Sequence, residues 1–217
     1  MRNLHPRRDD LVPREEAIQL LEPYFEPILA PFFEAFEVWQ EFERSLPWVR
    51  APLSSAAQAH FLNCQIVHRA KIRFEAFPEV RPFEECGFYC LAFQKRILLH
   101  FKKFDRDGFP RNIRTFQQEQ LAYQAQLDLP GIPPMATWVT AGYQLSPAAD
   151  AIIAVFVLCT YADRQLWSIP LFNADAGEPP LFPSVVPSPP RPAPTASPAA
   201  EEPQRKSKVR AKRRRTS

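Results

Sequence analysis

Three residues of the kinds that bind transition metals recur at a four-residue spacing: His60, Cys64 and His68. In a helix, residues four apart lie one turn apart on the same face, so either neighbouring pair could share a Zn²⁺ ion. The outer two cannot easily do so, because eight residues of helix span about 12 Å and Zn–ligand bonds are about 2 Å long. No CxxC or HExxH motif accompanies them. A buried helix stripe with a hydrogen-bonded histidine is the better explanation, and we expect no bound metal.

A set of acids and lysines in the middle of the chain is the other candidate for metal chemistry. Metal-dependent nucleases place carboxylates around the ion beside a lysine. The residues of this kind are Glu75, Glu84, Glu85, Asp105, Asp107, Lys102 and Lys103. The acid-x-lysine spacing of a catalytic strand is missing, since His100 and Phe101 stand two residues before the lysines. A metal-dependent nuclease or toxin-like hydrolase therefore stands as an alternative function, and a solvated hairpin end is the simpler explanation.

Motifs for nucleophilic catalysis and for cofactor binding are not found in the sequence. There is no G-x-S-x-G, and a pair such as Cys64 with His100 has no local signature. Cys86 and Cys90 are four apart in a predicted strand, a separation of about 13 Å that argues against a zinc knuckle. The glycines of the body are isolated and form neither a P-loop nor a dinucleotide fingerprint. We therefore predict no catalytic residues and no cofactor.

The clearest charge pattern lies at the C-terminal end. Residues 178–217 contain nine Lys/Arg and three Glu, whereas residues 1–177 contain 18 Lys/Arg and 21 Asp/Glu. A dense basic arm contacts phosphates without reading a base sequence. Its predicted nucleic-acid-binding residues are Arg205, Lys206, Lys208, Arg210, Lys212, Arg213, Arg214 and Arg215. An inert, solubilising extension is the alternative explanation of the same charges.

A second group of basic residues occurs in the middle of the chain, among phenylalanines that could stack on bases. Its members are Arg69, Lys71, Arg73, Lys95, Arg96, Lys102, Lys103, Arg106, Arg111 and Arg114. Solvation of the outer faces of a helix and a hairpin is the simpler explanation of these charges. We keep Lys102 and Lys103 as a secondary basic patch for nucleic acid.

The aromatic residues between 23 and 42 exceed what one helix stripe needs, and such an excess sometimes marks an interface. Phe32, Phe36 and Trp39 are accordingly the predicted partner-binding residues. A place in the core is the commoner explanation of the same residues.

Helical periodicity is present in two parts of the N-terminal third. Residues 14–46 repeat apolar side chains every three or four positions, but Pro23, Pro27 and Pro31 interrupt them. Each proline inside a helix costs about 3 kcal/mol. We therefore expect a short helix over 14–21, an irregular stretch, and a second helix from about 32 to 45. A longer helix is predicted over 55–76, with Ser54 or Ser55 as its N-cap.

The pattern then changes to the alternation of strands. Strands are predicted at 87–93, 96–102, 137–145, 151–160 and 165–171, with a Gln-rich helix of about a dozen residues starting at Thr115. The order helix-helix-strand-strand-helix-strand-strand-strand lacks the alternation of a parallel α/β sheet. The fold class is therefore α+β, with N-terminal helices, a mostly antiparallel sheet of about five strands and one inserted helix.

Several short segments resemble the common core of a group of uncharacterised bacterial proteins. They are 101–105 (FKKFD), 112–117 (NIRTFQ), 129–133 (LPGIP), 142–143 (GY) and 166–167 (LW), against a group pattern of "FKKLD…NIPT.Q…LPG.P…VGY…LW". Some of that group are encoded beside ImmA/IrrE-type metallopeptidases with helix-turn-helix regulators. The resemblance covers roughly residues 95–170, implies a cytosolic bacterial regulatory setting and assigns no activity. Arg114 stands where the group has proline, and the basic tail is not part of the pattern.

Composition predicts one folded domain over residues 1–177, followed by a Pro/Ala/Ser-rich disordered linker at 178–204 and a basic disordered tail at 205–217. The N-terminus has no apolar segment typical of a secretion signal. The longest apolar run, 151–159, is half the length of a membrane helix. We expect a cytoplasmic protein with no membrane partner and with its four cysteines as thiols.

These patterns predict a non-catalytic regulatory or accessory protein. Its folded part would bind a protein partner, and its basic tail would bind an anionic polymer, with DNA as the first candidate. The alternatives are the nuclease or hydrolase above, and an interaction protein whose tail is inert.

Overall fold

Six strands form one sheet in which the spatial order follows the chain order. The computed structural model describes residues 10–85, 88–110, 123–124, 136–162 and 164–176. The strands are β1 (Arg81–Glu85), β2 (Phe88–Phe93), β3 (Ile97–Lys103), β4 (Thr137–Leu145), β5 (Ile152–Tyr161) and β6 (Arg164–Asn173). All neighbours are antiparallel except β3 and β4, which are parallel. The predicted α+β class with a mostly antiparallel sheet is confirmed.

The parallel pairing of β3 with β4 follows from the length of the chain between them. Antiparallel neighbours can be joined by a tight turn, but parallel neighbours need a crossover of about a dozen residues or more. Residues 104–136 supply that crossover. The predicted helix from Thr115 falls in this segment and lies outside the described residues except at 123–124, which form a turn with a positive φ at Gln124. Cys86 also lies outside the described residues.

The five predicted strands are all present, and β1 is the one that sequence patterning missed. Its sequence, Arg81-Pro-Phe-Glu-Glu85, contains one apolar side chain suited to a strand. Proline has no backbone N–H and is tolerated in a sheet only at an edge. Pro82 fits here because β1 is an edge strand, paired on one side with β2.

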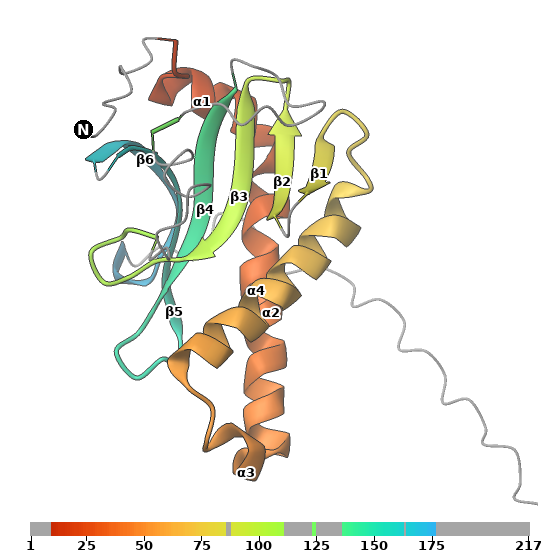
Figure 1. Cartoon of the computed structure of the whole chain (residues 1–217), viewed down its shortest axis with the longest axis vertical. Coiled ribbons are helices and arrows are strands. Elements are labelled where there is room, and N and C mark those ends of the chain that lie inside the picture. The colour runs from red at the N-terminus through yellow and green to blue at the C-terminus, as the bar shows by residue number, and fades with distance from the viewer. Residues whose placement is uncertain (1–9, 86–87, 111–122, 125–135, 163, 177–217) are drawn as a thin grey trace, which may run out of the picture. The chain divides into compact units, whose positions relative to one another are not determined.

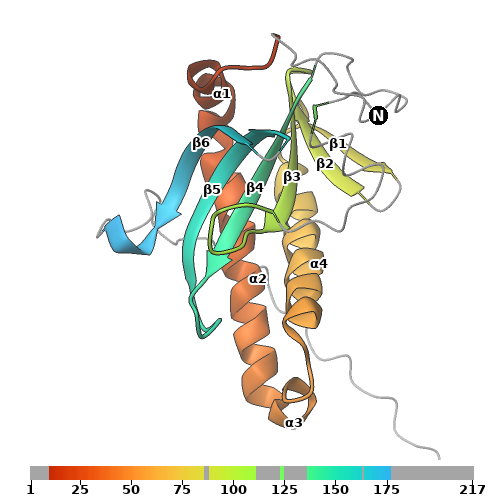
Figure 2. The same cartoon turned by 60° about the vertical axis from the view of Figure 1, so that its left-hand side comes forward.

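The helices lie on one face of the sheet, as Figures 1 and 2 show from two directions. They are α1 (Arg14–Leu21), the 3₁₀ turn η1 (Glu22–Tyr24), α2 (Phe25–Ser45), α3 (Pro47–Arg50) and α4 (Ser55–Phe74), and a second 3₁₀ turn η2 (Ala174–Ala176) follows β6. The predicted cap of α4 is present, since the Ser54 side chain accepts a hydrogen bond from the Ala57 N–H at 3.2 Å. Within the described segments, no helix is both long enough and apolar enough to cross a bilayer.

The prolines interrupt the N-terminal helices less than their spacing predicted. Pro23 lies in η1, which separates α1 from α2, but α2 begins at Phe25 rather than near residue 32. Pro27 costs no hydrogen bond, because it occupies the first turn of α2, where backbone N–H groups have no partner within the helix. Only Pro31 lies in the interior of α2, where it removes one backbone hydrogen bond without ending the helix. Burial of its helix neighbours Ile28 and Phe32 offsets that loss.

One hydrophobic core joins the helices to the sheet. It runs from Val12, just before α1, to Leu171 in β6. Leu91, Leu99 and Ala141 belong to it because alternate residues of β2, β3 and β4 point towards the helices. The chain before α1 is anchored by two backbone hydrogen bonds of Val12. Its N–H donates to Thr137 Oγ1 and its C=O accepts from Trp167 Nε1, each at 2.9 Å.

The opposite face of the sheet, which we call the second face, carries a smaller apolar cluster. The buried members are Cys90, Ala92, Leu98, Ala136 and Trp138, with Phe83 packed against them. The second face therefore has its own apolar side chains, and the polar residues among them are the first place to look for a site.

Candidate functional site

Three polar side chains form a row across the second face. Cys90 on β2 is the register partner of His100 on β3, and His100 is the register partner of Thr140 on β4. His100 Nε2 lies 2.7 Å from Thr140 Oγ1. Lys102 follows two residues after His100 and so points to the same face. The Cys90, His100 and Thr140 side chains are all buried.

The electrostatics of this row oppose nucleophilic catalysis. Burial, and to a lesser degree the charge of Lys102, lowers the pKa of His100 from 6.5 to about 3. Burial also raises the pKa of Cys90 from 9.0 to about 12, although Lys102 acts in the opposite direction. The thiol therefore stays protonated and the imidazole stays neutral at physiological pH. A reactive cysteine needs the reverse, a lowered thiol pKa.

A buried glutamine ties β4 to β5 beside this row. Gln124 accepts a hydrogen bond from the Trp138 N–H at 2.8 Å and donates to the Trp138 carbonyl at 2.9 Å and the Thr160 carbonyl at 2.8 Å. Three hydrogen bonds from one side chain fix the start of β4 against the end of β5. The row of Cys90, His100 and Thr140 and the hydrogen bonds of Gln124 stabilise the sheet, and their geometry does not expose a reacting group.

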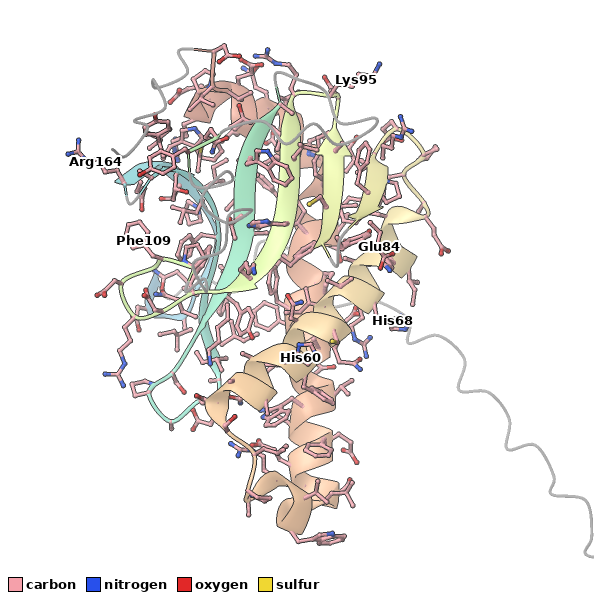
Figure 3. The ribbon with its side chains drawn as sticks, in the orientation of Figure 1. His60, His68, Glu84, Lys95, Phe109 and Arg164 are labelled. Carbon is pink, nitrogen blue, oxygen red and sulfur yellow. The ribbon has the colours of Figure 1, made fainter. Side chains whose placement is uncertain are left out.

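Cys64 and His100 do not form a pair, and the stripe of His60, Cys64 and His68, which we expected to be buried, is exposed. Cys64 lies on the exposed side of α4, whereas His100 lies on the second face of the sheet. Figure 3 shows His60 and His68 along α4. Cys64 Sγ is 3.7 Å from His60 Nε2. Among the described residues, no group of three or more His, Cys, Asp or Glu could hold a metal ion.

Two of the acids proposed for a nuclease, Glu84 and Asp105, have structural roles. Glu84 accepts from Lys71 Nζ at 2.5 Å, which links β1 to α4. Asp105 Oδ1 accepts from the N–H groups of Asp107 and Phe109 at 3.0 Å each and closes the loop after β3. These carboxylates do not gather around one point.

The basic residues of α4 are neutralised by acids of α2 and β1. Arg69 pairs with Glu34 at 3.1 Å, and Arg73 pairs with Glu26 at 3.2 Å and also with Glu34. Arg96, in the β2–β3 turn, pairs with Glu16 of α1 at 2.8 Å. The mid-chain basic group is therefore not one cationic surface, because its helical members hold the helices together.

Lys102 and Lys103 do not form one patch. Successive residues of a strand point to opposite faces, so Lys102 lies on the second face and Lys103 on the helix side of β3. Burial lowers the pKa of both lysines, and Cys90 partly counteracts this for Lys102. The eight basic residues predicted in the tail, Arg205 to Arg215, lie outside the described residues.

The three predicted partner-binding aromatics belong to the core. Phe32, Phe36 and Trp39 are 1%, 6% and 0% exposed, because that side of α2 packs against the sheet and α4. The excess of aromatic residues reflects a helix buried along most of its length. Trp48 of α3 is 70% exposed, with the partly exposed Leu46 and Val49 beside it. Only the tertiary structure distinguishes Trp48 from Trp39, since both follow apolar patterns in the sequence.

Comparisons with known proteins return no match to a family model, to a curated protein or to a solved structure. The resemblance of residues 95–170 to the uncharacterised bacterial group therefore stays a prediction.

Proposed function

We propose that this chain is a non-catalytic regulatory or accessory protein of the cytoplasm that binds an anionic polymer, DNA first of all, through residues 205–217. The observation that carries the proposal is the separation of charge along the chain. Residues 178–217 have nine Lys/Arg against three Glu, while residues 1–177 have more acids than bases. The ion pairs of Arg69, Arg73 and Arg96 support it further, because acids neutralise these basic residues within the described part of the chain.

The folded part has a second role in this proposal, which is to bind a protein partner. Its support is the apolar tip formed by Leu46, Trp48 and Val49, where α3 caps the far end of α2 (Figure 2). Such a convex apolar projection suits a partner that offers an apolar pocket. The closed polar row on the second face supports no catalytic alternative.

DNA binding is tested by fluorescence anisotropy of a labelled duplex with two full-length proteins. One is the natural chain, and the other, the tail-neutral variant, carries Gln in place of Arg205, Lys206, Lys208, Arg210, Lys212, Arg213, Arg214 and Arg215. We expect steeply salt-dependent binding by the natural chain, with a log–log slope of up to about −7 if all eight residues contact phosphates. The tail-neutral variant should bind weakly, with a slope near zero.

A control variant removes basic charge elsewhere. Arg44 pairs with Glu41 on exposed α2 surface, and Arg44→Gln should leave both the affinity and the slope unchanged. Equal binding by the natural chain and the tail-neutral variant would refute the tail as the DNA-binding element.

A further inference from the structure

A pocket of about 380 Å³ opens at the edge of the sheet formed by β1 and β2. Its walls come from four segments: Pro78 and Glu79 before β1, Arg81 and Phe83 on β1, Ala92 on β2, and Gln94 with Lys95 in the turn between β2 and β3. Ligand pockets range from about 300 to 1,000 Å³. This pocket lies at the small end of that range, which suits a single nucleotide unit better than a dinucleotide.

The turn that carries Lys95 has a defined backbone. Gln94 and Lys95 have φ angles of 47° and 59°, and the Arg96 N–H donates to the Phe93 carbonyl at 2.9 Å. Two successive positive φ angles are typical of the tight turn that joins antiparallel strands. Lys95 is exposed at this turn, as Figure 3 shows.

The pocket brings together an aromatic ring and two cations. Arg81 and Phe83 share one side of β1, and the Arg81 guanidinium lies 5.2 Å from the centroid of the Phe83 ring. Neither Arg81 nor Lys95 has a carboxylate partner among the described residues, unlike the cations of α4. An anion placed here would meet positive charge that no ion pair neutralises.

The one acid of the pocket is held in place. Glu79 Oε1 accepts a hydrogen bond from the Tyr24 hydroxyl at 2.8 Å. Its carboxylate can still accept from a donor in the pocket, because an ionised carboxylate has about four acceptor positions. The pocket therefore offers positive charge for a phosphate, an aromatic and guanidinium surface for a planar ring, and an acceptor for an amino group.

We propose that this pocket binds a nucleotide, with Arg81 and Lys95 on the phosphate, Phe83 and the Arg81 plane beside the base, and Glu79 facing an exocyclic amino group. Base–aromatic contacts and arginine stacking are the usual means of holding single-stranded nucleic acid. A bare phosphate would leave Phe83 and Glu79 unused, and an apolar ligand would leave the two cations unused. The inference deepens the proposed function, on which it rests, by giving the folded part a contact with an unpaired nucleotide.

The test is a titration of ¹⁵N-labelled full-length protein with adenosine 5′-monophosphate, followed by the backbone amide signals of Phe83, Ala92 and Lys95. We expect saturable shifts at these signals, and affinity at least tenfold higher for the nucleotide than for adenosine or inorganic phosphate alone. Arg81→Ala and Lys95→Ala should each weaken binding by about tenfold. Both residues are exposed, so the folds of these variants can be verified by their unchanged remaining spectra.

Arg164→Ala is the matched control, because Arg164 is exposed and lies at the opposite edge strand of the sheet (Figure 3). It should bind the nucleotide as the natural chain does. Absence of shifts at the three amides with millimolar nucleotide, or an equal loss in Arg164→Ala, would overturn the proposal.

A second arm identifies the source of the nucleotide and separates this inference from the role of the tail. Single-stranded oligodeoxyadenylate is titrated into the tail-neutral variant with and without Arg81→Ala. If adding Arg81→Ala lowers the affinity for the oligonucleotide tenfold, the pocket binds a nucleotide within a strand. If it leaves that affinity unchanged while the mononucleotide binds as expected, the pocket binds a free nucleotide. Duplex binding by the tail is measured separately, so a failure of this inference can be distinguished from a failure of the proposed function.

Discussion

At the scale of single residues, the most informative side chain is His100. The alternation of residues 96–102 predicted a strand, and residues two apart in a strand, such as His100 and Lys102, share a face. The alternation could not show which residues of the neighbouring strands would lie beside His100. The register places Cys90 on one side of His100 and Thr140 on the other, and these contacts make the histidine a buried, neutral part of the sheet.

His100 should make the stability of the protein depend on pH. Its folded pKa, about 3, lies below the ordinary value of 6.5, so as the pH falls the unfolded chain binds the proton first. The stabilisation is therefore complete above about pH 6.5 and is lost as the pH falls towards 3. Between pH 7 and 5 this histidine should account for a loss of about 2 kcal/mol in the free energy of unfolding.

The measurement is urea unfolding at pH 7, 5 and 4 for the natural chain, His100→Gln and His60→Gln. The loss of stability with falling pH should be smaller in His100→Gln by the stated amount. His60 is exposed, so its variant should follow the natural chain. Parallel pH profiles for the natural chain and His100→Gln would contradict the expectation.

At the scale of elements, the long helix α2 shows how burial overrides local preference. Three prolines at four-residue spacing predicted a break up to residue 31, yet α2 runs unbroken from Phe25 to Ser45. The helix stays continuous because Pro27 lies in its first turn and because one of its faces is buried. The short helix α3 behaves in the opposite way, because it has no buried residue and leaves Trp48 exposed.

Two tryptophans of these helices should respond differently to truncation. Trp39→Ala empties a site that is fully buried between α2 and α4 and should cost about 3–5 kcal/mol. Trp48→Ala removes a side chain that is 70% exposed and should change stability by less than about 0.5 kcal/mol. Urea unfolding measures both, and Trp39→Phe, a smaller change, keeps the comparison available if Trp39→Ala does not fold. Equal costs for the two alanine variants would contradict this assignment of core and surface.

The same variant bears on the proposed protein partner. Trp48→Ala should leave the fold unchanged and should weaken the binding of a partner that docks on the tip of α3. Retained binding of that partner by Trp48→Ala would exclude the tip as its docking site.

At the scale of the whole molecule, the described helices and strands share one core, which extends from Val12 to Leu171. The charges of α4 are balanced by acids from α2 and β1. The basic residues beyond 204 add charge to the chain in a segment whose composition predicts no packed core. Folding and DNA binding should therefore be separable.

The tail-neutral variant should unfold with the same free energy as the natural chain, within about 0.5 kcal/mol. Because Trp39 is in α2 while Trp138 and Trp167 are in the sheet, tryptophan fluorescence reports on both layers. Its urea transition should coincide with that of far-ultraviolet circular dichroism, as expected for one cooperative unit. Two separate transitions would show that the helices and the sheet do not unfold together. A shifted midpoint in the tail-neutral variant would show that the tail contributes to stability.

The sequence by itself determined the fold class, five of the six strands and the capped helix α4, because periodicity and capping are local properties of the chain. It also determined the charge separation on which the proposed function depends, since charge is a matter of composition. The tertiary structure alone decided what becomes of individual side chains. The core contains Phe32, Phe36 and Trp39. Opposite faces of β3 carry Lys102 and Lys103, and one pocket is lined by Arg81, Phe83 and Lys95. Such outcomes depend on which distant segments pack together, and no local pattern specifies the strand register or the helix face that brings them into contact.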